Sequence, residues 1–162
     1  MNTSNLETKN IKLVPKTLPE VHAMIEAMSA DEKLQLSADW LALLHGSTSA
    51  NPWVHGFSMV QRDSEVIVGT AGFKGPPGAD GMVEIAYGVA AEHQGKGFAT
   101  EAAQALVAYA FDSGQVRAVR AHTLPEANAS TRVLTKCGFQ HLGKVIDPED
   151  GSVWRWEKSP AP

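Results

Sequence analysis

The chain has 162 residues, 43% of them apolar and 20% charged, which is the composition of one globular domain rather than of a disordered or fibrous protein. Fourteen Lys and Arg against eighteen Asp and Glu give a net charge of −4, so nucleic acid and anionic membrane surfaces are poor partners. A single cysteine, Cys137, excludes an internal disulfide, and no segment has the length of a membrane span or the pattern of a signal peptide. We expect one cytoplasmic domain over residues 8–158, with frayed termini at 1–7 and 159–162.

Strand and helix signals alternate along this domain. Asp31 is expected to cap the second helix, with Leu34 on its apolar face and Gly46 at its end. The predicted elements are a strand at 11–14, helices at 18–28 and 31–46, strands at 57–61, 65–73 and 82–89, a helix at 98–112, a strand at 116–123, a helix at 130–137, and strands at 139–145 and 153–157.

The order of these elements predicts the fold class. In the helix at 98–112, every fourth residue from Phe98 to Ala110 is apolar, which is typical of a helix that packs on a sheet. We expect an α/β (α+β) fold, a mixed and mostly antiparallel sheet with helices on both faces. One central βαβ crossover leads from the strand at 82–89 through this helix to the strand at 117–123.

The loop before this helix, residues 94–100 (QGKGFAT), has the features of a phosphate-binding turn. The first backbone N–H groups of a helix have no partner within the helix, and the aligned peptides add a positive partial charge there. Gly95 and Gly97 remove the side chains that would keep an anion away, and Lys96 adds a positive charge. A tight turn that needs glycine for its geometry explains the same residues, so both interpretations stay open.

Two familiar nucleotide-binding motifs fit this loop badly. The Walker motif, Gly-x-x-x-x-Gly-Lys followed by Ser or Thr, is absent. The dinucleotide fingerprint would place Thr100 where Gly or Ala is expected. No acidic residue stands about 20 positions after Gly95, and the chain has one βαβ unit only. A dinucleotide-binding oxidoreductase is therefore disfavoured.

Three separated blocks carry a family resemblance: 83–89 (VEIAYGV), 94–101 (QGKGFATE) and 124–139 (LPEANASTRVLTKCGF). In order and spacing they resemble the GNAT family of N-acetyltransferases, in particular its RimJ/RimL-type branch, whose acetyl-CoA motif is [Gln/Arg]-x-x-Gly-x-[Gly/Ala]. The resemblance covers about 8–158 and is strongest from 66 to 143. It implies the family fold, in which the two strands of the crossover splay apart at one end.

The same resemblance implies acetyl-CoA as the cosubstrate and no metal ion. Pantetheine would lie in the gap between the splayed strands, and the diphosphate on the first amides of the helix. The implied cofactor-binding residues are Val89, Gln94, Gly95, Lys96, Gly97, Phe98, Ala99, Thr100 and Asn128. Ala86 and Gly88 leave space for a ligand on the strand face that carries Glu84.

Acetyl transfer to an amine requires a deprotonated amine, a stabilised carbonyl oxygen and a proton for the departing thiolate. About a tenth of an α-amine is neutral at pH 7, against less than about one in a thousand for a lysine side chain, so an enzyme for α-amines needs only a weak base. Glu84 matches a frequently acidic family position and is the candidate base, although an ion-paired strand carboxylate explains it nearly as well. Ser130 is the second candidate catalytic residue, near the sulfur, or else a helix cap.

The sequence departs from the wider family at two positions. The tyrosine often credited as general acid aligns with Leu134, which leaves protonation of the thiolate to Ser130 or water. The common Asn aligns with Ala127, and Asn128 one place later contacts pantetheine or only caps the helix. Among the remaining polar residues, His122 is interpreted as structural rather than catalytic.

Other candidates are left as alternatives. Trp53, His55 and Phe57 line an acceptor pocket or belong to the core, and Cys137 belongs to the core. The leading hypothesis is an acetyl-CoA-dependent N-acetyltransferase, monomeric or homodimeric. Its acceptor would be a small-molecule or peptide amine: a protein N-terminal α-amine, an amino acid or a small amine. The alternative is a catalytically silent acyl-CoA-binding module.

Overall fold

One eight-stranded sheet organises the computed structural model, which describes residues 6–34, 36, 38, 41–42, 52–148 and 151–160. The strands lie in the order β1-β2-β3-β4-β5-β6-β8-β7. In chain order the elements are β1 (Leu6–Glu7), β2 (Ile11–Pro15), α1 (Leu18–Glu26), α2 (Ala30–Leu34), α4 (Pro52–His55), β3 (Phe57–Gln61), β4 (Ile67–Phe73), β5 (Met82–Val89), the 3-10 helix η1 (Ala91–His93), α5 (Phe98–Asp112), β6 (Ala118–Thr123), α6 (Ala129–Lys136), β7 (Gln140–Asp147) and β8 (Gly151–Lys158). Within these segments no helix combines the length and apolar character needed to cross a membrane.

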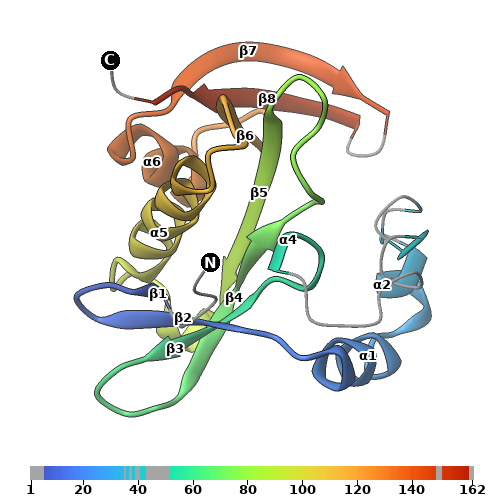
Figure 1. Cartoon of the computed structure of the whole chain (residues 1–162), viewed down its shortest axis with the longest axis vertical. Helices are drawn as coiled ribbons and strands as arrows, with labels where there is room; N and C mark the ends of the chain where they lie inside the picture. The colour runs from blue at the N-terminus through green and yellow to red at the C-terminus, as the bar shows by residue number, and fades with distance from the viewer. Residues whose placement is uncertain are drawn as a thin grey trace.

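The pairing of the strands confirms the mixed, mostly antiparallel sheet. Every neighbouring pair is antiparallel except β5 and β6. These two run parallel because the chain passes through α5 between them, and parallel neighbours need such a crossover. Figure 1 shows β5 at the centre of the molecule with α5 and α6 together on one side of it, while α1 and α2 lie on the opposite side of the view.

The parallel pair is bonded over a short stretch only. Met82–Glu84 pair with Ala118–Arg120, yet β5 continues to Val89 and β6 to Thr123. Beyond Glu84 the edges of the two strands are therefore not joined to each other, and the predicted splay is confirmed. Strand backbone left without a strand partner can bond a ligand instead.

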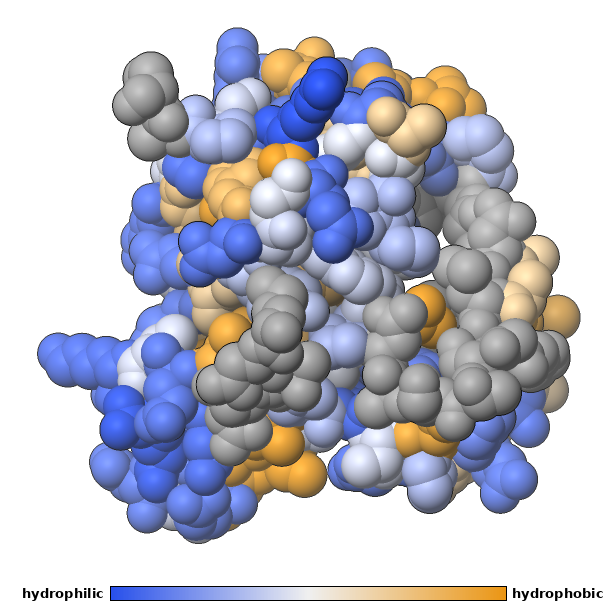
Figure 2. Space-filling view, in the orientation of Figure 1, coloured by the Kyte–Doolittle hydropathy of each residue, from blue (hydrophilic) through white to orange (hydrophobic). Residues whose placement is uncertain are grey.

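The core lies between the sheet and α5. The predicted apolar stripe on α5 is buried: Phe98 is 4% exposed, and Ala102, Leu106 and Ala110 are 0% exposed. From the sheet, alternate residues of β5 such as Val83 and Ile85 point into the same cluster. Seen from outside, the face in Figure 2 is mostly hydrophilic, with hydrophobic residues in small separate groups.

Two details differ from the sequence-based expectation. Leu6 and Glu7, placed in a frayed terminus, form β1 and pair with Leu13 and Lys12. Asp31 does not cap the second helix but lies inside α2. There the hydroxyl of Ser29 accepts a hydrogen bond from the Glu32 backbone N–H, and the Glu32 carboxylate accepts one from the Ser29 N–H.

This reciprocal cap at Ser29 starts the helix two residues earlier than a cap at Asp31 would. Leu34 is 80% exposed, so its predicted place on a buried face is wrong. Most of the remainder of the predicted helix, including Gly46, falls outside the described residues.

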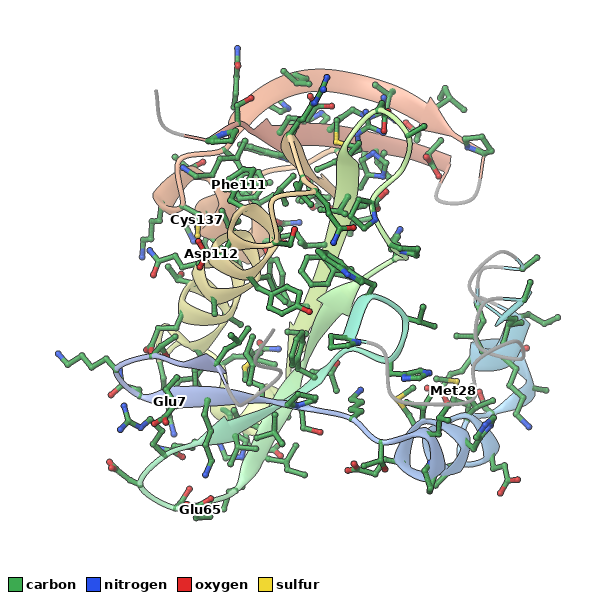
Figure 3. The ribbon with its side chains drawn as sticks, viewed as in Figure 1. Glu7, Met28, Glu65, Phe111, Asp112 and Cys137 are labelled. Carbon is green, nitrogen blue, oxygen red and sulfur yellow. The ribbon has the colours of Figure 1, made fainter. Side chains whose placement is uncertain are left out.

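Glu101, in the first turn of α5, connects this helix to the N-terminal hairpin. Its carboxylate accepts hydrogen bonds from the Thr8 hydroxyl and from the backbone and side-chain nitrogens of Asn10. Figure 3 shows Glu7 and Glu65 at the same end of the molecule, where they pair with Arg62 at 3.3 Å and Lys12 at 3.1 Å. The Glu101 carboxylate thus holds the hairpin against the start of α5.

Replacing Glu101 with Gln should lower the free energy of unfolding at neutral pH by roughly 1 kcal/mol, because solvent weakens the hydrogen bonds of a partly exposed carboxylate. Burial raises the pKa of Glu101, but the hydrogen bonds from Thr8, Asn10 and Ile11 outweigh it and hold the pKa below its ordinary 4.5. Stability gained from a lowered pKa is present above pH 4.5 and is lost as pH falls through the folded-state pKa. The difference between wild type and variant in urea unfolding should therefore shrink on acidification. Glu126→Gln, at an exposed carboxylate, is the control and should leave the free energy of unfolding at neutral pH nearly unchanged.

Candidate functional site

The loop before α5 leaves the start of this helix open. Gly95 and Gly97 have φ of +79° and +84°, a region that favours glycine. Gly97 is the N-cap, and no side chain caps the helix there. Among the residues that the structure describes, a Cβ added at either glycine would meet no atom within 4 Å beyond its chain neighbours. The first amides of α5, from Phe98 to Thr100, have no partner within the helix, and these residues lie beside the space that the two glycines leave open.

These amides border a cavity of about 360 Å³, here called the helix groove, which lies between the end of β5, the start of α5 and α6. The Gln94 side chain donates to the Val89 carbonyl oxygen at 2.9 Å and so fixes the loop to β5. The residues that line the groove are Tyr87, Gly88, Val89, His93, Gln94, Gly95, Gly97, Phe98, Ala99, Thr100, Ala129, Ser130, Arg132, Val133 and Lys136.

Most of the predicted cofactor-binding residues are among these, but Lys96 and Asn128 are not. The positive charges of the groove come instead from Arg132 and Lys136. Neither residue was predicted from the sequence, although their spacing of four residues puts them on one face of α6.

Asn128 caps α6, which is one of the two roles predicted for it. Its carboxamide oxygen accepts from the Thr131 backbone N–H at 3.0 Å, and the Thr131 hydroxyl oxygen accepts from the Asn128 N–H at 3.0 Å. This reciprocal cap begins α6 and places Ser130 in its first turn.

A second cavity of about 300 Å³, the strand cleft, lies where β5 and β6 diverge. Its lining includes Glu84 and Ala86 of β5 and His122 of β6. Tyr87 and Ser130 line the strand cleft and the helix groove alike, so the two cavities adjoin at this pair. The Tyr87 hydroxyl lies 3.2 Å from Ser130 Oγ.

Glu84 stands in the strand cleft with two basic neighbours. Its Oε2 lies 2.8 Å from Lys74 Nζ and 3.4 Å from His122 Nδ1. Neither contact has the direction of a good hydrogen bond, and this oxygen is buried, so the 18% exposure of the side chain belongs to its other atoms. Glu84 is therefore ion-paired, as one of the two interpretations predicted, and also accessible from the cleft.

Arg155 on β8 sets the tautomer of His122. The Arg155 Nε–H donates to His122 Nε2 at 3.1 Å, so that nitrogen carries no proton. The proton of the neutral imidazole is then on Nδ1, which faces Glu84. The His122 side chain is only 5% exposed, and its Nδ1 points toward the Glu84 carboxylate. This contact with Glu84 was not predicted from the sequence.

Several candidates lie in the core instead. Phe57 is 1% exposed, and Trp53 and Phe73 pack with Tyr109 in one aromatic cluster. Leu134 is 0% exposed. His55 is 4% exposed and lines neither the helix groove nor the strand cleft.

Cys137, labelled in Figure 3 at the end of α6, is also buried. Its Sγ lies 3.7 Å from the Thr100 carbonyl oxygen. Burial raises the pKa of this thiol, against a smaller opposite effect of Lys158. The thiol is therefore protonated at neutral pH, and Cys137 is a core residue as predicted.

Curated relatives of this chain are named as uncharacterised N-acetyltransferases. An uncharacterised N-acetyltransferase of Bacillus licheniformis, p20, is 36% identical over 93 residues, which are 57% of this chain and 52% of p20. A second one, YjdG of Bacillus subtilis, is 27% identical over 149 residues, 85% of this chain and 86% of YjdG. The match thus spans about half of p20 and most of YjdG.

Solved structures share the fold at low sequence identity. RimL, a ribosomal L7/L12 alpha-N-protein acetyltransferase in complex with coenzyme A, has a TM-score of 0.68 at 17% identity, covering 96% of this chain and 97% of RimL. The microcin C7 self-immunity acetyltransferase MccE, in complex with acetyl-CoA and AMP, has a TM-score of 0.69 at 17% identity over 98% of both chains.

The family assignment rests on a match that spans well over half of the chain. Residues 11–140 match the family described as acetyltransferase (GNAT) domain. This match covers the glycine loop, both splayed strands and α6, which supply most of the lining of the helix groove and the strand cleft. The chain belongs to the GNAT acetyltransferase family.

Proposed function

We propose that this chain transfers the acetyl group of acetyl-CoA to a primary amine, by direct attack of the amine on the thioester. The observation that carries the proposal is the junction of the two cavities at Tyr87 and Ser130. A cosubstrate held in the helix groove and an acceptor held in the strand cleft could meet there, and a reaction between bound partners gains from such proximity.

The helix groove suits coenzyme A in shape and charge. The amides from Phe98 to Thr100 and the positive end of α5 would hold the diphosphate, and Gly95 and Gly97 leave room for it. Arg132 and Lys136 supply positive charge for further phosphate oxygens. Acetyl-CoA bound there would supply the acetyl group as a thioester, and the residues of the groove would orient it toward the junction.

The strand cleft suits the amine. Glu84 would accept the proton that the amine loses, because its carboxylate lies in this cleft and is partly exposed to it. Two side chains lie next to that carboxylate: the ammonium group of Lys74 and the imidazole of His122. Arg155 holds the imidazole in place. Ser130 lies at the junction, close to where the thioester would be.

The acceptor class proposed is a protein N-terminal α-amine, an amino acid or a small amine. RimL is named as an acetyltransferase of the alpha-amine of ribosomal protein L7/L12, and MccE as an acetyltransferase of microcin C7 self-immunity. Proteins of this fold therefore carry different named roles. An α-amine is partly neutral at neutral pH, so a single carboxylate is enough to take up the proton that it loses on acetylation.

The test is the release of free thiol from acetyl-CoA, followed over a panel of α-amines, amino acids and small amines. We expect release with at least one amine, and formation of the corresponding N-acetyl product by mass spectrometry. Tight binding of coenzyme A without release on the whole panel would instead support an acyl-CoA-binding module. No binding of coenzyme A would refute both functions.

A further inference from the structure

The leaving thiolate of an acetyl transfer needs a proton. At position 134, where the family often has a tyrosine, this chain has no group that can donate one. Leu134 stands there, has no proton to donate and is 0% exposed within the core. If the proposed function holds, another group near the junction of the helix groove and the strand cleft must stabilise or protonate the sulfur.

Two hydroxyl groups meet at that junction. Tyr87 comes from β5 and Ser130 from the first turn of α6, and their oxygens are 3.2 Å apart. Each lines both cavities. Of the two, a phenol is far more acidic than an aliphatic alcohol, so the phenol is the better proton donor.

We propose that Tyr87 is the catalytic proton donor to the departing thiolate, and that Ser130 passes a replacement proton to it. The inference rests on the proposed acetyl transfer. It assigns the acid role to the strand that also carries Glu84, three residues earlier, so acid and base lie on one rigid element.

The protons and electrons of this step balance. The nitrogen–carbon bond forms and the carbon–sulfur bond breaks, with its electron pair moving to sulfur. The Tyr87 proton goes to the sulfur, the Ser130 hydroxyl proton to the Tyr87 oxygen, and a proton from water returns to Ser130. The proton lost by the amine leaves through Glu84, so the net products are an amide and a free thiol.

The surroundings of Tyr87 keep its hydroxyl protonated at neutral pH. Burial raises the pKa of Tyr87 above its ordinary value of 10.0, and the hydrogen bond with Ser130 acts against that rise to a smaller extent. A buried neutral phenol is present in the donor form over the whole physiological pH range.

The first test removes only the hydroxyl. Tyr87→Phe should lower kcat about 10- to 30-fold, a modest factor because a phenol is a weaker acid than the thiol it protonates, and should leave the dissociation constant of coenzyme A unchanged. Tyr109 is the only other tyrosine of the chain and packs in the aromatic cluster, so Tyr109→Phe is the matched control and should keep wild-type kcat. Equal thermal melting of both variants would show that folding is intact.

The second test separates a proton donor from a merely structural tyrosine. In the Tyr109→Phe background the phenol at position 87 is the single tyrosine, and its ionisation can be followed by absorbance. A fluorinated tyrosine incorporated at position 87 has a more acidic phenol. The alkaline limb of the kcat–pH profile should then move to lower pH by the same amount as the phenol pKa.

The outcomes are distinct. Wild-type kcat in Tyr87→Phe, or an alkaline limb that does not follow the phenol pKa, overturns the role of Tyr87 while acetyl transfer stands. No turnover of wild type with any amine refutes the proposed function and this inference with it. A slower Tyr87→Phe together with a limb that moves supports the assignment.

Discussion

Replacing Gly97 with Leu should raise the dissociation constant of coenzyme A at least about 100-fold, or about 2.7 kcal/mol. The added side chain would enter the open space at the start of α5, where the described part of the chain has no atom within 4 Å of the new Cβ beyond its neighbours in sequence. A phosphate could then no longer approach the donors from Phe98 to Thr100. Titration calorimetry with coenzyme A measures the change directly.

Gly114 provides the matched control at the other end of the same helix. Its φ is +75°, close to the +84° of Gly97, and its added Cβ would also meet no atom within 4 Å. A leucine at either position is strained by roughly 1–2 kcal/mol because of the left-handed backbone, so the two variants should lose similar stability. Equal affinity of both variants for coenzyme A would contradict a phosphate site at Gly97.

Replacing Glu84 with Gln should lower kcat/KM by about 100- to 1000-fold for an amine of lysine-like pKa. The change keeps the size of the side chain and removes its charge and basicity. Roughly a tenth of an α-amine is already neutral at pH 7, against less than about 0.1% of a lysine side chain. The loss should therefore be smaller for an α-amine than for the more basic amine, when both are measured by thiol release.

Glu157 on β8 serves as the control carboxylate. It accepts a hydrogen bond from Arg120 at 3.0 Å and is 26% exposed, but it lines neither the strand cleft nor the helix groove. Glu157→Gln should therefore keep nearly wild-type kcat/KM with both amines. If Glu84→Gln behaves like Glu157→Gln with the basic amine, Glu84 is not the base.

The fold was largely predictable because its determinants are local. Alternating burial along β5, the apolar stripe of α5 and glycines with positive φ at 97, 114 and 138 all act within a few residues. The second helix was misplaced because Ser29 competes with Asp31 as a cap, and the choice depends on the reciprocal bond of Glu32. Short β1 was missed since two residues carry no periodic signal.

The candidate site was predictable only where its residues belong to one continuous segment of the chain. The glycine loop reads directly from the sequence, and so does Glu84 once the family resemblance is used. The pair of Tyr87 and Ser130 spans 43 positions, and His122 and Arg155 are 33 apart. Such pairs depend on the sheet register and on the angle of α6, which no spacing in the sequence specifies.

The first amides of α5 are proposed to hold the phosphates of coenzyme A, and amide resonances measure this contact most directly. In a ¹⁵N–¹H spectrum titrated with coenzyme A, we expect the largest shifts at residues 95–100, with smaller ones at Arg132 and Lys136. Wild-type protein in which coenzyme A binds while these six amides stay unshifted would contradict the account.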